Sequence, residues 1–98
     1  MAEWPERDEV VQLLDIGDDQ WIENHLQHAL DSAIEQVKKD VGNWDDDSDT
    51  PTESQRQAAL RAVAVLRVNA PDDGWRSLRA DRIYQGLIFG TRRRFGIS

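Results

Sequence analysis

Three consecutive arginines near the C-terminus, Arg92, Arg93 and Arg94, are the side chains best suited to recognise another molecule. A guanidinium group presents five N–H donors in a planar fork that fits phosphate and carboxylate oxygens. Phosphate recognition would suggest nucleic acid. However, the chain has a net charge of −7 and a pI of about 4.6, which disfavours approach to a duplex. One cluster of three arginines also displaces only a few counterions.

Apolar side chains surround this cluster and favour a different interpretation. Aromatic and aliphatic anchors beside arginine are typical of protein interfaces, where the guanidinium groups pair with carboxylates. We therefore interpret the C-terminal stretch as a docking segment for a protein partner. Its candidate docking residues are Tyr84, Leu87, Phe89, Arg92, Arg93, Arg94, Phe95 and Ile97.

Other residues that could do chemistry form weaker patterns. Asp45, Asp47 and Asp49 have the spacing of the first ligands of an EF-hand loop, but Thr50 stands where that loop needs glycine. Two histidines lie three residues apart without a third ligand, the chain has no cysteine, and no serine has a nucleophile motif. We expect no catalytic site, no metal and no cofactor.

Four tryptophans are many for a polar chain of 98 residues. Each is expected near a helix end or in a loop, where so small a domain cannot bury all four. Two of them would cover the core, and the others would suit an interface, where aromatic residues are enriched. Trp44 and Trp75 are the candidate interface aromatics.

Charge is divided unevenly along the chain. Residues 1–54 carry three basic and sixteen acidic side chains, a balance of −13, whereas residues 55–98 carry nine arginines and three aspartates, a balance of +6. Such asymmetry favours head-to-tail attraction between copies or an interface with two different faces. Folding of the basic half onto the acidic half of the same chain is an equally good explanation.

The elements that must position these residues are all predicted to be helices. A short helix begins near Pro5, and Gly17 permits the turn after it, with Asp18 or Asp19 capping the next helix. That next helix, residues 19–41, has apolar residues at the helical period and ends at Gly42.

The second half of the chain begins with a predicted capping box, with Thr50 as N-cap and Glu53 at the third position. The helix that follows is apolar around most of its circumference, which predicts burial on two sides, either in the centre of the domain or between subunits. It ends before Pro71. Residues 72–74 predict a turn, and a shorter helix starting near Ser77 or Asp81 ends at Gly90. The fold class is therefore all-α, a bundle of about four helices, with residues 1–90 as a helical domain and residues 91–98 as an extended arm.

The order of these parts resembles the head-to-tail connector, or adaptor, proteins of tailed bacteriophages. The matching stretches are residues 10–15, 18–19, 29–34, 51–60 and 81–97. The last of them, which reads DRIYQGLIFGTRRRFGI, looks like the ending of adaptors from phages that infect actinobacteria and is the most specific part.

The resemblance implies a virion structural protein rather than an enzyme. Such adaptors form a ring, dodecameric in this family, between the portal protein and a stopper or tail-completion protein. Genomic DNA passes through the ring without sequence-specific binding, and the C-terminal segment reaches the portal. The arm would then be residues 91–98, and the protein would be found at the head-to-tail interface of the virion and in host cytoplasm during assembly.

Two other functions remain open on the residues alone. A small nucleic-acid-binding or regulatory helical protein could use the C-terminal arginine cluster on phosphates. An acidic DNA mimic would use the charge of residues 1–54, but would leave the C-terminal stretch without a role.

Overall fold

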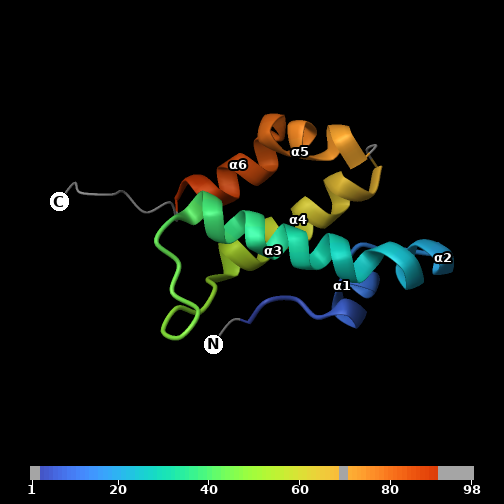
Figure 1. Cartoon of the computed structure of the whole chain (residues 1–98), viewed down its shortest axis with the longest axis horizontal. Coiled ribbons are helices and arrows are strands. Elements are labelled where there is room, and N and C mark those ends of the chain that lie inside the picture. The colour runs from blue at the N-terminus through green and yellow to red at the C-terminus, as the bar shows by residue number, and fades with distance from the viewer. Residues whose placement is uncertain (1–2, 69–70, 91–98) are drawn as a thin grey trace.

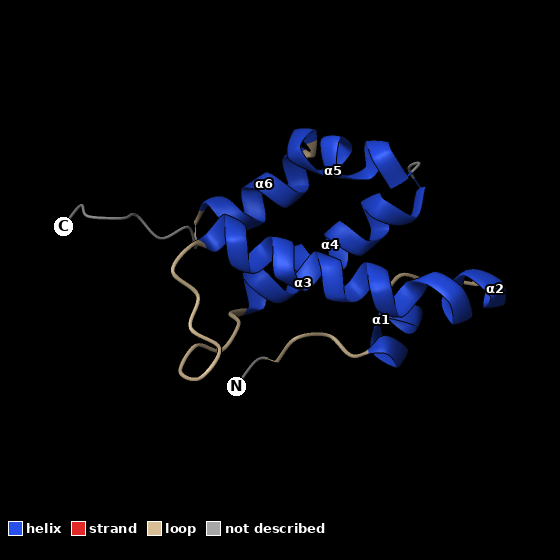
Figure 2. Cartoon of the chain, viewed as in Figure 1, coloured by secondary structure: helices blue, strands red, loops and turns tan. Residues whose placement is uncertain are grey.

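The structure is a computed structural model that describes residues 3–68 and 71–90, without side chains for residues 71–73 and 75. Within these ranges every regular element is a helix and no strand is present (Figure 2). The predicted all-α class is therefore confirmed. Nor does any helix of the described ranges combine the length and apolarity needed to cross a bilayer. Residues 91–98, predicted as the arm, lie outside the described residues.

The first helix, α1 (Arg7–Leu13), ends in a turn centred on Asp15, whose φ is 50°. The Asp15 N–H donates to the carbonyl of Gln12 and the Ile16 N–H to that of Val11, which is the Schellman arrangement. The left-handed residue at this turn is therefore Asp15 rather than the predicted Gly17. Aspartate tolerates this conformation better than most residues with a side chain.

The long helix predicted over residues 19–41 is present, but it changes its winding. It consists of α2 (Asp19–Trp21), a π-helical turn η1 (Ile22–Leu26) and α3 (Gln27–Val41) in continuous succession. Asp18 caps it by accepting a hydrogen bond from the Trp21 N–H, as predicted. Gly42, at φ 86°, ends it. The inward stripe is Leu26, Leu30, Ala33, Val37 and Val41.

The capping box of α4 (Glu53–Val68) lies two residues later than predicted. Thr52 Oγ1 accepts from the Gln55 N–H, and Gln55 Oε1 accepts from the Thr52 N–H. The sequence TESQ fits the box as well as the predicted TPTE does, and with this choice the side chain of buried Gln55 has a partner. Thr50 is therefore not the cap.

The predicted turn at residues 72–74 is wrong, because a further helix begins there. Helix α5 (Pro71–Ala80) precedes α6 (Arg82–Phe89), and Asp81 separates them. Proline fits the first position of a helix because its missing N–H needs no partner there. Gly74 does not make a turn but permits close packing, since a Cβ at this position would lie 2.8 Å from Leu66 Cδ2. The described residues thus form five helices when α2, η1 and α3 count as one.

Helix α4 is the centre of the molecule, and α3, α5 and α6 all pack against it (Figure 1). Ala58, Ala59 and Ala62 are fully buried along it, so neighbouring helices approach closely. Arg56 forms an ion pair with Glu9 that fastens α1 to α4. The prediction that α4 is buried on more than one side is confirmed.

Candidate functional site

Helix α6 leads into the C-terminal stretch, and its position is set by Asp81. The Asp81 carboxylate accepts from the Tyr84 N–H at 2.9 Å, which caps α6. It also accepts from Arg61 Nε at 2.9 Å and Arg61 Nη2 at 2.8 Å, a two-pronged pair with α4. The hydrogen bonds from Arg61 lower the pKa of Asp81, burial opposes this, and the Tyr84 N–H adds to the lowering.

Tyr84 fastens the inner face of α6 to α3. Its side chain is 1% exposed, and its hydroxyl donates to Asp40 Oδ2 at 2.6 Å. Ile88, one turn further on, is also fully buried, and Leu87 is half-buried against the core. Tyr84 was expected among the docking residues, but the structure makes it a core residue, because α6 turns this face toward α3 and α4.

The opposite side of α6 carries a contiguous exposed surface. At about 100° per residue, the exposed positions fall within one arc of the helix, with Gly86 near its middle. Phe89 is 75% exposed and Ile83 is 57% exposed. We call this surface the outer α6 face; it consists of Arg82, Ile83, Gly86, Phe89 and Gly90.

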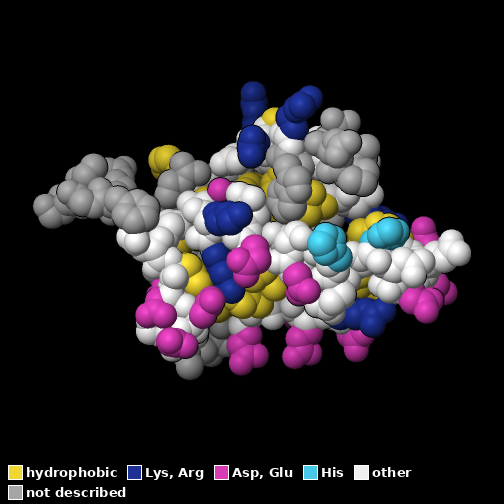
Figure 3. Space-filling view, in the orientation of Figure 1, with side chains coloured by type: hydrophobic (Ala, Val, Ile, Leu, Met, Phe, Trp, Pro, Cys, Tyr) yellow, Lys and Arg dark blue, Asp and Glu magenta, His cyan; other side chains and the backbone are white. Residues whose placement is uncertain are grey.

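Arginines extend this surface onto α5. Arg76 and Arg79 are exposed one turn apart, and Arg82 follows on α6. Among the side chains that the structure describes, none of the three has a carboxylate within ion-pair distance. Basic side chains gather over α5 and α6 along the upper edge of Figure 3, whereas acidic ones line the lower edge. Much of the charge division of the sequence is thus also a division between these two edges of the molecule.

The acidic loop after α3 is held by hydrogen bonds between its own residues. The Asp45 carboxylate accepts from the Asp47 N–H and from Ser48 Oγ, while Asp49 accepts from the Asp45 N–H. Lys38 Nζ lies 2.9 Å from Asp46, which ties the loop to α3. In the described ranges, no three histidines or carboxylates are grouped so that they could hold a metal ion.

Trp44, expected as an interface aromatic, has a partner within the chain. Its ring centroid lies 5.4 Å from that of Trp4, and both rings are half-buried against the core. Part of its surface therefore remains available. The side chain of Trp75 lies outside what the structure describes, as do Arg92, Arg93, Arg94, Phe95 and Ile97. Their docking role stays a prediction.

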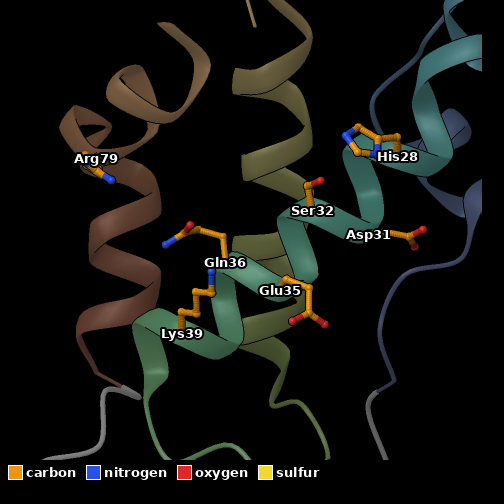
Figure 4. A pocket seen from close by; sticks show the side chains of 7 residues that line it. All are labelled: His28, Asp31, Ser32, Glu35, Gln36, Lys39 and Arg79. Atoms are coloured by element: carbon orange, nitrogen blue, oxygen red, sulfur yellow. The ribbon is translucent and has the colours of Figure 1, made fainter. Parts of the chain in front are cut away.

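A polar groove of about 530 Å³ separates α3 from α5 (Figure 4). In this view Gln36 points toward the helix that carries Arg79, whereas Asp31 points away from it. His28 lines the groove from the exposed side of α3. Acidic, basic and amide groups are mixed in it, and no lining residue is buried, so the arrangement does not select one class of ligand.

Ile83, Gly86, Arg76 and Arg79 belong to the exposed surface but were not among the predicted docking residues. Placing the N-cap at Asp81 and projecting the following residues onto a helical wheel would have separated Phe89 from Tyr84. The arginines of α5 could not be placed, because α5 itself was predicted as a turn.

No family model, no curated protein and no solved structure matches this chain.

Proposed function

We propose that this chain is a virion structural protein, a head-to-tail adaptor of a tailed bacteriophage that acts by assembly rather than catalysis. The observation that carries the proposal is the outer α6 face, where exposed apolar side chains stand beside arginines directly before the C-terminal arginine cluster. A surface of this composition suits protein docking. The all-α fold is the fold class that the sequence resemblance implies.

In the proposed assembly, copies form a ring that joins the portal protein to a stopper or tail-completion protein. Residues 91–98 engage the portal, with Arg92, Arg93 and Arg94 pairing to carboxylates and Phe95 and Ile97 filling apolar pockets. Acidic surface that stays exposed in the ring lines the DNA channel and keeps the passing genome from adhering, because like charges repel. The site of action is the head-to-tail interface of the virion, after assembly in host cytoplasm.

Removal of residues 91–98 tests the proposal. The truncated chain should keep its helical circular dichroism and its unfolding midpoint, because the described core is built from residues between Trp4 and Ile88. It should fail to join the purified portal ring of its phage in sedimentation and class-average images. The matched control is the full chain with exposed Val68 changed to serine, which should still join. Normal joining by the truncated chain would contradict the proposal.

Nucleic-acid binding is the second candidate, favoured by Arg76, Arg79 and Arg82 on the described surface in addition to the C-terminal cluster. A salt titration of affinity for a DNA duplex separates the two functions. Tight binding with a steep salt dependence, abolished by alanine at Arg92, Arg93 and Arg94, would favour this candidate. Weak binding that these alanines leave unchanged would favour the adaptor.

A further inference from the structure

We infer that the outer α6 face docks onto the acidic end of a second copy of this chain, in a head-to-tail contact. The acidic end is the surface of α1, α2 and η1 that carries Asp8, Asp15, Asp19 and Glu23. The inference rests on the proposed function in one respect, since a ring needs a contact between its copies. It assigns that contact to two named surfaces.

Gly86 is the first observation, because no described residue lies close enough to require a glycine there. It lies inside α6 at an exposed position, and a Cβ added to it would meet no atom within 4 Å. Glycine in a helix interior costs about 1 kcal/mol relative to alanine. Gly74 in α5, by contrast, accommodates Leu66. The bare backbone at Gly86, between Ile83 and Phe89, suits close approach by another chain.

Charge complementarity identifies the occupant as a second copy. Arg76 and Arg82 lie on or beside the outer α6 face, and Arg79 lies one turn after Arg76 at the edge of the groove against α3; none of the three has a carboxylate partner among the described side chains. The four carboxylates of the acidic end are exposed and likewise have no described cationic partner. Pairing the two sets would place each of these arginines against a carboxylate of the neighbouring copy.

The acidic end also offers a place for an apolar side chain. A shallow groove of about 440 Å³ lies between α1 and η1, and half-buried Val11 and Ile22 contribute apolar surface to it. Asp8 and Gln12 edge the groove, and Arg7 donates to the Ile22 carbonyl at 3.3 Å. An aromatic anchor such as Phe89, flanked by arginine, suits a groove with an apolar lining and an acidic edge.

The two surfaces belong to different parts of one molecule, so a copy cannot satisfy both with itself. Helices α1 and α2 lie toward one end of the long axis, and α6 ends toward the other (Figure 1). Helix α6 packs instead on α3, α4 and α5. A contact that joins two different surfaces repeats from copy to copy and closes as a ring when the rotation permits.

Self-association of the full chain, measured by sedimentation velocity up to about 1 mM, tests the inference. Wild type should associate reversibly, and less so as salt rises from about 0.05 M to about 0.5 M. Phe89→Ser should weaken association about tenfold or more. Val68→Ser is the matched control, because Val68 is 76% exposed and Phe89 75%, and it should change nothing. Equal loss in both variants would overturn the inference.

Gly86→Ala distinguishes a role of this glycine in the contact between copies from a role in the stability of the fold. It should raise the unfolding midpoint, because no described atom opposes the added methyl group, and yet weaken association by severalfold. A merely structural glycine would not move these two measurements in opposite directions. An unchanged association constant in a stabilised variant would contradict the inference.

Mixing two defective variants tests the head-to-tail geometry. One carries Arg82→Glu and Phe89→Ser, and the other carries Asp8→Lys and Glu23→Lys; each alone should be monomeric. Together they should form a one-to-one dimer, since each retains the surface that the other lacks. Lys39→Glu, an exposed substitution on α3, changes the net charge by the same amount as Arg82→Glu and is therefore the charge control for the first variant.

Two further results would overturn the inference: a wild type that is monomeric throughout the concentration range, or a mixture that stays monomeric while wild type associates. Capture of the same monomeric chain by a portal ring would leave the proposed function standing without this contact. The two failures are thus distinguishable.

Discussion

Helices α4 and α6 show opposite relations to the rest of the fold. Helix α4 has neighbours on several sides, and seven of its sixteen residues are buried. Helix α6 buries Tyr84 and Ile88 on one side and exposes Phe89 and Ile83 on the other. Both helices are rich in apolar residues, so composition alone does not distinguish them. The difference lies in whether the apolar side chains have partners within the chain.

This contrast separates stability from recognition. Apolar side chains of α4 lower the free energy of the folded state, because folding removes them from water. Phe89 and Ile83 stay largely exposed after folding and therefore add little to the free energy of unfolding. In the proposed contact they would be buried against a second copy. Substitutions in α4 should therefore change unfolding, whereas substitutions on the outer α6 face should change association.

The largest effect should come from a cavity in α4. Leu60→Ala removes a side chain that is 5% exposed and should lower the free energy of unfolding by about 2–5 kcal/mol. Phe89→Ala removes a larger side chain and should change it by less than about 0.5 kcal/mol. Urea denaturation of both variants measures the difference. A similar loss of unfolding free energy in the two variants would contradict the proposed difference between α4 and the outer α6 face.

The second largest effect should come from Asp81, which links α6 to Arg61 of α4. Asp81→Ala removes the cap of α6 and the partner of Arg61, and should cost about 2 kcal/mol. Only a small part of this free energy comes from the ion pair, because Arg61 is 37% exposed and solvent screens the charges. Asp31→Ala is the control, since exposed Asp31 accepts from Gln27 alone among the described side chains. A loss no larger than that of the control would show that this link contributes nothing.

The same carboxylate should make stability depend on pH. Arg61 lowers the pKa of folded Asp81 below the ordinary value of about 3.9, so its contribution is complete above that value. The contribution is lost as the pH falls through the lowered pKa of the folded state. The difference in unfolding free energy between wild type and Asp81→Asn should therefore shrink from pH about 6 to pH about 2. A difference independent of pH would contradict this.

A smaller effect is expected from the anchor between α3 and α6. Tyr84→Phe removes the hydroxyl that donates to Asp40 and should cost about 1–2 kcal/mol without changing self-association. A double-mutant cycle with Asp40→Ala, which removes the acceptor, should give a coupling of about 1 kcal/mol. Coupling near zero would mean that the hydrogen bond contributes no net stability.

Two glycines provide the smallest and sharpest comparison. Gly86→Ala should raise the free energy of unfolding by about 0.8–1.0 kcal/mol, because its added Cβ meets nothing. Gly74→Ala should gain less or lose, because its Cβ would displace the Leu66 side chain. Thermal unfolding of the two variants measures this. An equal rise in the free energy of unfolding in both variants would mean that α5 has as much room for a methyl group at Gly74 as α6 has at Gly86.

Sequence periodicity was sufficient for the long helix and for α4. Asp18, Gly42 and the apolar stripe from Leu26 to Val41 each act locally, so their positions follow from spacing. The predicted position of the capping box was wrong by two residues, because TPTE and TESQ both satisfy the pattern. Only the burial of Gln55 decides between them.

The last third of the chain was harder to predict, because tertiary packing overrides its local signals. Aspartates followed by glycine usually mark a turn, but Gly74 is needed where α5 approaches Leu66. Tyr84 and Phe89 are both aromatic residues in an apolar helix, and only the position of α3 and α4 makes one buried and the other exposed. The docking residues beyond Gly90 were identified by composition and resemblance, which specify no geometry.

The contact between Trp4 and Trp44 gives the protein an optical signature. Two indole rings 5.4 Å apart and tilted by 49° couple their excited states, which should produce paired bands of opposite sign in the far-ultraviolet circular dichroism. The pair holds the extended residues before α1 against the loop after α3. Loss of these bands on binding, with helical ellipticity unchanged, would report that a partner had displaced this N-terminal segment.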